Sequence, residues 1–224
     1  MNRFVAVLMV PAAALALVGS PATAATTVVL DTDTTIDAGH SFLDAAVEIR
    51  DGLDGPTTVT LVDGGVLHQG GVVSESSQLI MQGGDIDFFV TVEDSAKLTI
   101  VGGSVGCRMD ECLLIDYDSL VGATGGGEIH IRGGDINDSL QLRDTSAAHF
   151  YGTNLLAEDA GGGSLYVSGR FANNELFSIR VGGASLPGTS VVLHTIPEPS
   201  TWMLAALAVV SMAAGRRRRP RATA

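Results

Sequence analysis

The sequence has few of the residues on which thiol-redox and zinc sites are built. It contains two cysteines, Cys107 and Cys112, and they do not form a Cys-x-x-Cys motif. No histidine stands near them at the spacing of a zinc site, and the five histidines are scattered along the chain. We therefore expect no metal and no cofactor. Lys97 is the only lysine, which leaves few residues for acid–base chemistry beside the carboxylates.

Positive charge is scarce in the middle of the chain. Six of the 13 Lys and Arg residues lie near the termini, so residues 25–195 contain seven basic and 24 acidic residues, a net charge of −17. Such a body repels nucleic acid and anionic membranes, and it attracts divalent cations only loosely. Its Val, Ile and Leu recur at regular spacing, which excludes a disordered acidic chain.

The N-terminus has the pattern of a signal peptide. Arg3 supplies the positive charge, residues 4–18 are apolar, and Ala22-Thr23-Ala24 is a small-x-small cleavage motif. We predict that residues 1–24 are a signal peptide, cut by signal peptidase between Ala24 and Ala25. The stretch is too short for a first transmembrane helix.

Glycine-centred segments recur through the middle of the chain. Residues 79–86 read Leu-Ile-Met-Gln-Gly-Gly-Asp-Ile, and residues 98–105 and 129–136 repeat this pattern. The leading glycines, including those of an earlier copy and two weaker later ones, are Gly64, Gly83, Gly102, Gly133, Gly152 and Gly169. The first three are evenly spaced, and Gly133 and Gly152 have the same spacing, which we call the regular interval. The last interval is slightly shorter, and the one from Gly102 to Gly133 is much longer.

Alternating apolar segments lie between the glycine pairs, so we predict two short strands and two turns per repeat. A repeat of this length is too short to bury an apolar face alone, so its copies must stack. We predict an all-β body over residues 25–195, a parallel β-helix or β-solenoid of about seven short coils. Glycine at a corner allows φ > 0 where the chain turns sharply.

The spacing of the aliphatic residues and of the repeats also bears on the handedness of the coil and on the alternative fold. The aliphatic spacing slips at each glycine pair, which favours a right-handed or irregular coil over a left-handed hexapeptide helix. The alternative is an antiparallel β-sandwich, against which the exact self-similarity of the repeats argues.

Three segments depart from the regular repeat. The long interval from Gly102 to Gly133 holds Cys107, Cys112 and three consecutive glycines at 125–127, and we interpret it as one coil with an inserted loop. In an exported protein we expect the two cysteines to form a disulfide. Residues 28–30 and 47–49 are expected strands, although Ser41 and Asp44 also suit a helix over residues 42–50. Residues 176–181 and 191–193 are the last expected strands.

The repeated acidic residues are the main candidates for chemistry. Polysaccharide-cleaving β-helices need acidic clusters with a basic residue on one exposed face. The candidates here are Asp85, Asp87, Asp135, Asp138 and Arg132. Aspartate also suits turns by bonding nearby backbone N–H groups, so repetition alone explains these positions and we expect no enzyme activity. Residues 83–87 resemble a calcium-binding β-roll loop only weakly, because Ile86 replaces its third glycine.

The C-terminus combines three features in order. Pro197-Glu198-Pro199 is followed by an uncharged apolar segment, residues 200–215, and then by Arg216, Arg217, Arg218 and Arg219. As a helix, residues 196–215 would be about 30 Å long, enough to cross a membrane. The arginines favour the cytoplasmic side, which places residues 25–195 on the other side.

This tail, residues 196–224, resembles the PEP-CTERM sorting signal of Gram-negative bacteria. The resemblance implies recognition at Pro197, Glu198 and Pro199 by exosortase, a membrane enzyme, and delivery to the cell surface or matrix. Five residues follow the arginines, where the family usually ends sooner. We therefore expect an exported protein, held transiently in the inner membrane with its body in the periplasm. Its expected role is structural, in a surface matrix or biofilm with exopolysaccharide as a further candidate partner. A carbohydrate-binding or carbohydrate-cleaving β-helix is the alternative.

Overall fold

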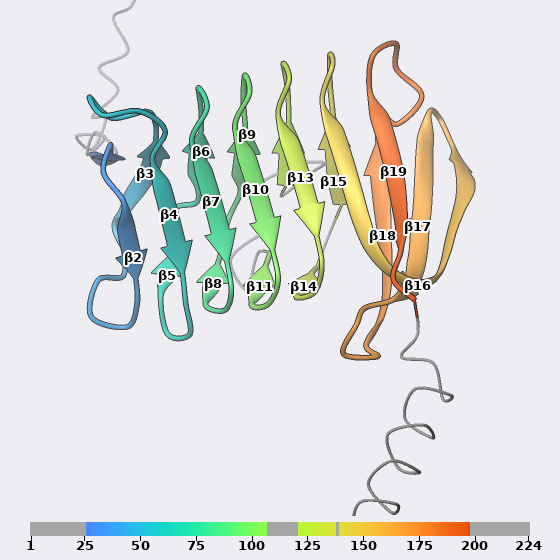
Figure 1. Ribbon diagram of the computed structural model, residues 1–224, viewed down its shortest axis with the longest axis horizontal. Coiled ribbons are helices and arrows are strands. Elements are labelled where there is room, and N and C mark those ends of the chain that lie inside the picture. The colour runs from blue at the N-terminus through green and yellow to red at the C-terminus, as the bar shows by residue number, and fades with distance from the viewer. Residues whose placement is uncertain (1–25, 107–120, 138, 198–224) are drawn as a thin grey trace, which may run out of the picture.

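The computed structural model describes residues 26–106, 121–137 and 139–197 (Figure 1). These residues form strands, turns and no helix, so the expected all-β class is confirmed. Within them, no helix is long and apolar enough to cross a membrane. The expected signal peptide with Ala24 and Ala25, the disulfide of Cys107 and Cys112, and the C-terminal helix with its arginines lie outside the described residues.

Most of the strands pair in three parallel ladders. We call the first ladder A, in which seven described strands pair side by side in parallel. They are β1 (Thr26–Leu30), β3 (Ala45–Ile49), β6 (Gly71–Val73), β9 (Val90–Val92), β12 (Val121–Ala123), β15 (Ser139–Leu142) and β18 (Leu176–Gly182).

Ladder B also contains seven described strands in parallel. They are β2 (Thr34–Ile36), β4 (Thr58–Leu61), β7 (Gln78–Met81), β10 (Lys97–Ile100), β13 (Glu128–Ile131), β16 (Ala147–Gly161) and β19 (Ser190–Thr195). Ladder C is shorter and has four two-residue strands. They are β5 (Val66–Leu67), β8 (Asp85–Ile86), β11 (Ser104–Val105) and β14 (Asp135–Ile136).

The sequence repeat sets the register of these ladders. Leu79 pairs with Leu98 and Leu98 pairs with Ile129, so equivalent residues of successive repeats stand side by side. Each regular repeat contributes one strand to each of the three ladders, which corrects the expected two strands and two turns to three of each. Ladder neighbours are parallel throughout, so the antiparallel sandwich is wrong for this part of the chain.

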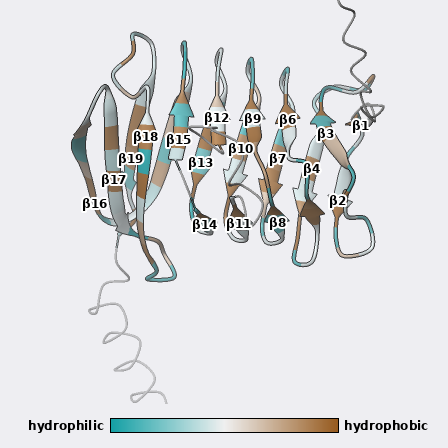
Figure 2. Ribbon diagram, turned by 180° about the vertical axis from the view of Figure 1, so that it is seen from behind, coloured by the Kyte–Doolittle hydropathy of each residue, from teal (hydrophilic) through white to brown (hydrophobic). Residues whose placement is uncertain are grey.

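The core lies between the ladders. Side chains alternate along each strand, and the inward residues are buried, as in β7, where Leu79 and Met81 are buried and Gln78 and Ile80 are partly exposed. The alternation of apolar and polar positions can be followed in Figure 2. Fully buried members from the three ladders include Ile36, Leu61, Leu67, Val73, Ile86, Leu98, Ile100, Ile129 and Phe150.

Glycine is required at the corner between ladders B and C. Gly103 has φ of +84°, and a Cβ there would lie less than 3.0 Å from the carbonyl oxygen of Gly84 in the preceding repeat. Gly84 and Gly134 also have positive φ and approach the preceding repeat closely. The positive φ thus falls on the second glycine of these pairs.

The inserted loop belongs to a single corner. Residues 87–89 join β8 to β9, whereas the much longer stretch of residues 106–120 joins β11 to β12. This extra length accounts for the excess of the Gly102–Gly133 interval over the regular one. The glycines at 125–127 are not part of this insertion, because they form the next corner, between β12 and β13.

The ends of the described body depart from the prediction. Residues 45–49 form β3 and Phe42 bridges Leu67, so the alternative helix over residues 42–50 is wrong. At the other end β16 runs on past the ladder and returns as an antiparallel hairpin with β17 (Ser164–Arg170), which pairs with β18. Gly152 is the last residue of β16 that pairs with β19, and Gly169 lies in β17, so neither glycine starts a new repeat.

Candidate functional site

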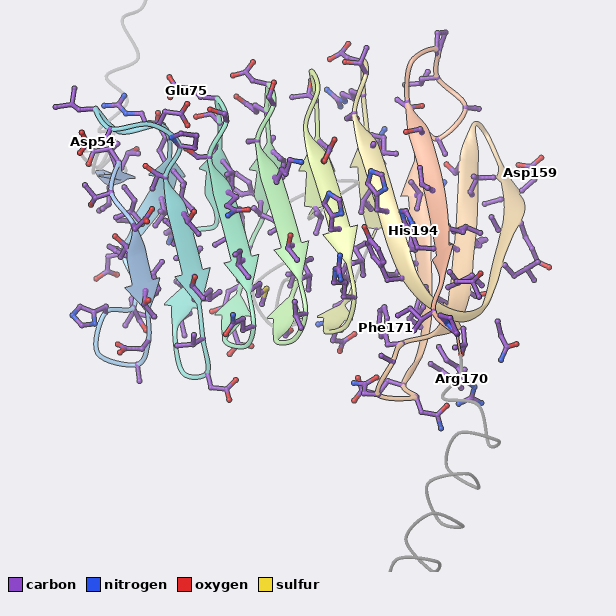
Figure 3. All side chains as sticks on the ribbon, viewed as in Figure 1. Asp54, Glu75, Asp159, Arg170, Phe171 and His194 are labelled. Carbon is purple, nitrogen blue, oxygen red and sulfur yellow. The ribbon has the colours of Figure 1, made fainter. Side chains whose placement is uncertain are left out.

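Polar and aromatic side chains gather on the outer face of ladder B, over β10, β13, β16 and β19. We call this group the histidine cluster. It consists of Lys97, Glu128, His130, Arg132, His149, Tyr151 and His194. Figure 3 shows His194 on this face, at the end of the ladder near the C-terminal hairpin.

Strand alternation and parallel register together build the cluster. Ile129 and Ile131 point into the core, so Glu128 and His130 point outward from the same strand. His130 pairs with His149, and Tyr151 pairs with His194. Neighbouring strands are about 4.8 Å apart, so paired rings stack. The ring centroids of His130 and His149 are 4.5 Å apart, and those of Tyr151 and His194 are 4.3 Å apart.

Hydrogen bonds hold the imidazole rings in place. His149 Nδ1 lies 3.0 Å from His194 Nε2, and His130 Nδ1 lies 3.0 Å from Tyr151 Oη. His130 Nε2 lies 3.1 Å from Glu128 Oε2. Both nitrogens of His130 are therefore engaged, and its side chain is only 17% exposed.

Neighbouring charged groups and burial shift the pKa values of Glu128 and His149. Lys97 Nζ lies 3.0 Å from Glu128 Oε2, and the hydrogen bonds from Lys97 and His130 hold the pKa of Glu128 below its usual value. Partial burial lowers the pKa of His149, and the nearby charge of His130 lowers it further. Glu128 is thus an anion and His149 a neutral imidazole at neutral pH.

Three side chains of the cluster have the arrangement of metal ligands. One ligand atom each of Glu128, His130 and His149 lies within 4.8 Å of the other two. His130, His149 and His194 are scattered along the sequence, but the fold brings them together here. The available sequence signal was that His130 and His149 are separated by one regular interval, like Gly133 and Gly152. The position of His194 in the sequence does not indicate this contact, because 45 residues, including the hairpin, separate it from His149.

The predicted acidic candidates do not converge on one site. Asp85 and Asp135 occupy equivalent places in ladder C but are separated by Ser104 of the strand between them, about 9.6 Å at two strand spacings. Asp87 lies 2.9 Å from His68, and Arg132 lies over the ring of Tyr151. Asp138 lies outside the described residues.

Ser104 also stands in a Gly-x-Ser-x-Gly sequence, residues 102–106. A nucleophile elbow requires a strand-to-helix turn, whereas Ser104 begins a two-residue strand after a glycine corner. Its hydroxyl accepts a hydrogen bond from Asn137 at 3.4 Å. This geometry does not support a serine nucleophile.

The C-terminal tail leaves the body at the end of ladder B. β19 ends at Thr195, Ile196 N donates to Gly152 O at 2.8 Å, and Pro197 is exposed. Residues 195–219 match the family model of the PEP-CTERM protein-sorting motif. The PEP-CTERM resemblance is therefore confirmed, and the match supports an exported protein sorted by exosortase. Comparison with curated proteins and with solved structures gives no match.

Within the PEP-CTERM motif, the roles of individual residues remain predictions. Pro197, Glu198 and Pro199 lie in its first residues, and Arg216 to Arg219 lie at its end. The match begins at the last residue of β19, so the motif follows the final strand of the body without an intervening linker.

Proposed function

We propose that this chain is a structural protein of the cell surface or extracellular matrix. Its body is a short parallel β-solenoid, and exosortase processes its tail after signal peptidase has cut between Ala24 and Ala25. The PEP-CTERM match directly after β19 is the observation on which the proposal rests. The three ladders support the solenoid assignment, because each is continuous across the repeats.

A structural role fits the chemistry of the body. Residues 25–195 have a net charge of −17, which keeps such a protein soluble and away from anionic surfaces during transport. The acidic candidates lie apart in ladder C and its corners, so the body is proposed to have no catalytic centre. The tail would direct sorting, and the body would be the part that is delivered to the surface.

The sorting proposal is tested at the Pro-Glu-Pro sequence. Pro197 and Pro199 donate no backbone hydrogen bond and disfavour a helix, so an extended segment at the membrane boundary is the form in which exosortase would meet it. Replacing Pro197, Glu198 and Pro199 with alanine should leave unprocessed protein in the inner membrane, as followed by fractionation and mass spectrometry of the C-terminus. Pro220→Ala, outside the matched residues, is the control and should be processed normally. Normal processing and surface delivery of the triple variant would refute exosortase recognition here.

Carbohydrate binding is the second candidate, and one groove favours it. A groove of about 570 Å³ lies between the glycine corners of the repeats and the turn from β17 to β18. Its polar lining includes Asp135, Asn173 and Glu175, and Asn173 Nδ2 donates to Glu175 Oε2 at 2.7 Å. This volume is within the range of small-ligand sites. Because the body is strongly acidic, neutral glycans are expected to bind in preference to anionic ones.

A glycan array and a reducing-sugar assay separate the two candidates. Binding that Glu175→Gln abolishes, with no sugar released, would establish a lectin-like role. Glu158→Gln is the matched control, because Glu158 lies in β16 where it pairs with β17 and does not line the groove. Absence of glycan binding would leave the structural role as the function of the body.

A further inference from the structure

We propose that Glu128, His130 and His149 bind a first-row transition cation, Cu²⁺ or Zn²⁺, on the outer face of ladder B. His194 and Tyr151 would position the two imidazoles. This site is independent of the sorting tail and of the glycan groove. It replaces the sequence-based expectation that the chain has no metal site.

The ligand atoms are spaced closely enough to share one ion. Two ligands about 2.1 Å from a tetrahedral cation lie about 3.4 Å apart. Glu128 Oε2 and His130 Nε2 are 3.1 Å apart, so a small rotation of either side chain makes room for the ion. The ligand atom of His149 lies within 4.8 Å of both. A cation between these groups would take the place of the proton that joins Glu128 to His130.

Neighbouring side chains support both imidazole rings from behind. Metal-binding histidines usually bond a neighbour through the ring nitrogen that does not contact the ion, and this fixes the ring orientation. His149 Nδ1 contacts His194 Nε2, and His130 Nδ1 contacts Tyr151 Oη, each at 3.0 Å. In both rings this leaves Nε2 as the ligand nitrogen. The rings of His130 and His149 are stacked with an interplanar angle of 5°, so one of them must tilt for both Nε2 atoms to point at the same ion.

The three ligands also select the kind of ion. Two imidazoles and one carboxylate suit Zn²⁺ and Cu²⁺, and the general order of affinities places Cu²⁺ first. Ca²⁺ and Mg²⁺ prefer a shell made of oxygen atoms, which this cluster does not provide.

The positive charge of Lys97 disfavours the binding of a cation at Glu128, so a substitution of Lys97 tests the proposed site. Its ammonium bonds Glu128 at 3.0 Å and must move away when a cation binds, which its 49% exposed side chain allows. Arg132 also adds positive charge, although it lies over the ring of Tyr151. Lys97→Gln should consequently tighten metal binding, which no purely structural role of the cluster predicts.

Calorimetric titration of the full-length chain in detergent, without a polyhistidine tag, tests the site. We expect one Cu²⁺ or Zn²⁺ per chain, a nitrogen-coupled Cu²⁺ resonance spectrum, and no comparable binding of Ca²⁺ or Mg²⁺. His149→Ala should abolish this binding, and His194→Ala should weaken it about 10–100-fold. His40→Ala is the control, because His40 is exposed and bonds Asp37 away from the cluster.

Circular dichroism checks that each variant is folded. Tighter binding by Lys97→Gln supports the site even if His149→Ala fails to fold. Three results would overturn the proposal: no binding of either ion, binding that survives in a folded His149→Ala variant, or equal affinity for Ca²⁺.

Discussion

Single residues in this protein are constrained mainly by the neighbouring repeat. Gly103 shows this most clearly, because its backbone has φ of +84° and Gly84 of the preceding repeat lies directly against it. An alanine there would strain its own backbone and also push the two repeats apart. The same stacking explains why His130 and His149, which are one regular interval apart in the sequence, become neighbours.

Gly103→Ala should lower the free energy of unfolding. The left-handed backbone alone costs an alanine about 1–3 kcal/mol, and the contact with Gly84 adds to this. Gly122→Ala is the matched control, because Gly122 lies in β12 and the nearest atom to a Cβ there is Thr91 Oγ1 at 3.9 Å. We expect the control to be neutral or slightly stabilising.

Urea denaturation followed by circular dichroism measures both variants. An equal midpoint for Gly103→Ala and the natural protein would mean that the corner relaxes freely, contrary to the tight approach of the two repeats.

At the scale of elements, the connections between equivalent strands differ in length from repeat to repeat. Residues 106–120 connect β11 to β12, where the equivalent connection between β8 and β9 is only residues 87–89. The flanking strands nevertheless keep their register, since Val121 pairs with Val90 and Ser104 with Asp85. The stack is thus set by the strands and glycine corners, while this connection varies in length.

Deleting residues 108–119 should therefore leave the fold intact. It shortens the connection to the length of the one between β8 and β9 and restores the regular interval of the repeat. Loop length alone changes stability only weakly, by about 0.6 kcal/mol per doubling. The deletion also removes Cys112, so Cys107→Ser and Cys112→Ser in the intact chain serve as the control for loss of the predicted disulfide.

Thermal unfolding followed by circular dichroism measures these variants. A small change in melting temperature in both is expected. If the deletion unfolds the body and the cysteine variants do not, the loop is part of the core and our interpretation of the corner is wrong.

At the scale of the whole molecule, the described body has two different ends. The N-terminal end begins with β1 and β2 at the edges of ladders A and B, whereas the C-terminal end is built from the hairpin of β16, β17 and β18 (Figure 1). β19 then returns beside β16, completes ladder B and leads into the PEP-CTERM motif. The proposed metal site lies between β13 and β16, so an ion there would link the last regular repeat to the strand that begins the hairpin.

The sequence by itself determined the all-β class, the register of the repeat and the sorting tail. These depend on local patterns: alternating apolar residues, glycine pairs at corners, and three tail features in order. The predicted number of strands per repeat, two, was wrong, and the structure has three. Strands of two residues such as β8 are too short to show a period of their own in the sequence.

The tertiary structure alone decided where the repeat stops and what lies on its outer face. Gly152 fits the repeat in sequence, but β16 continues past it because β17 is available to pair with it. Likewise His194 joins His149 only because the hairpin brings β19 back to ladder B. A contact across 45 residues depends on how the chain returns, and no local pattern around either histidine encodes that.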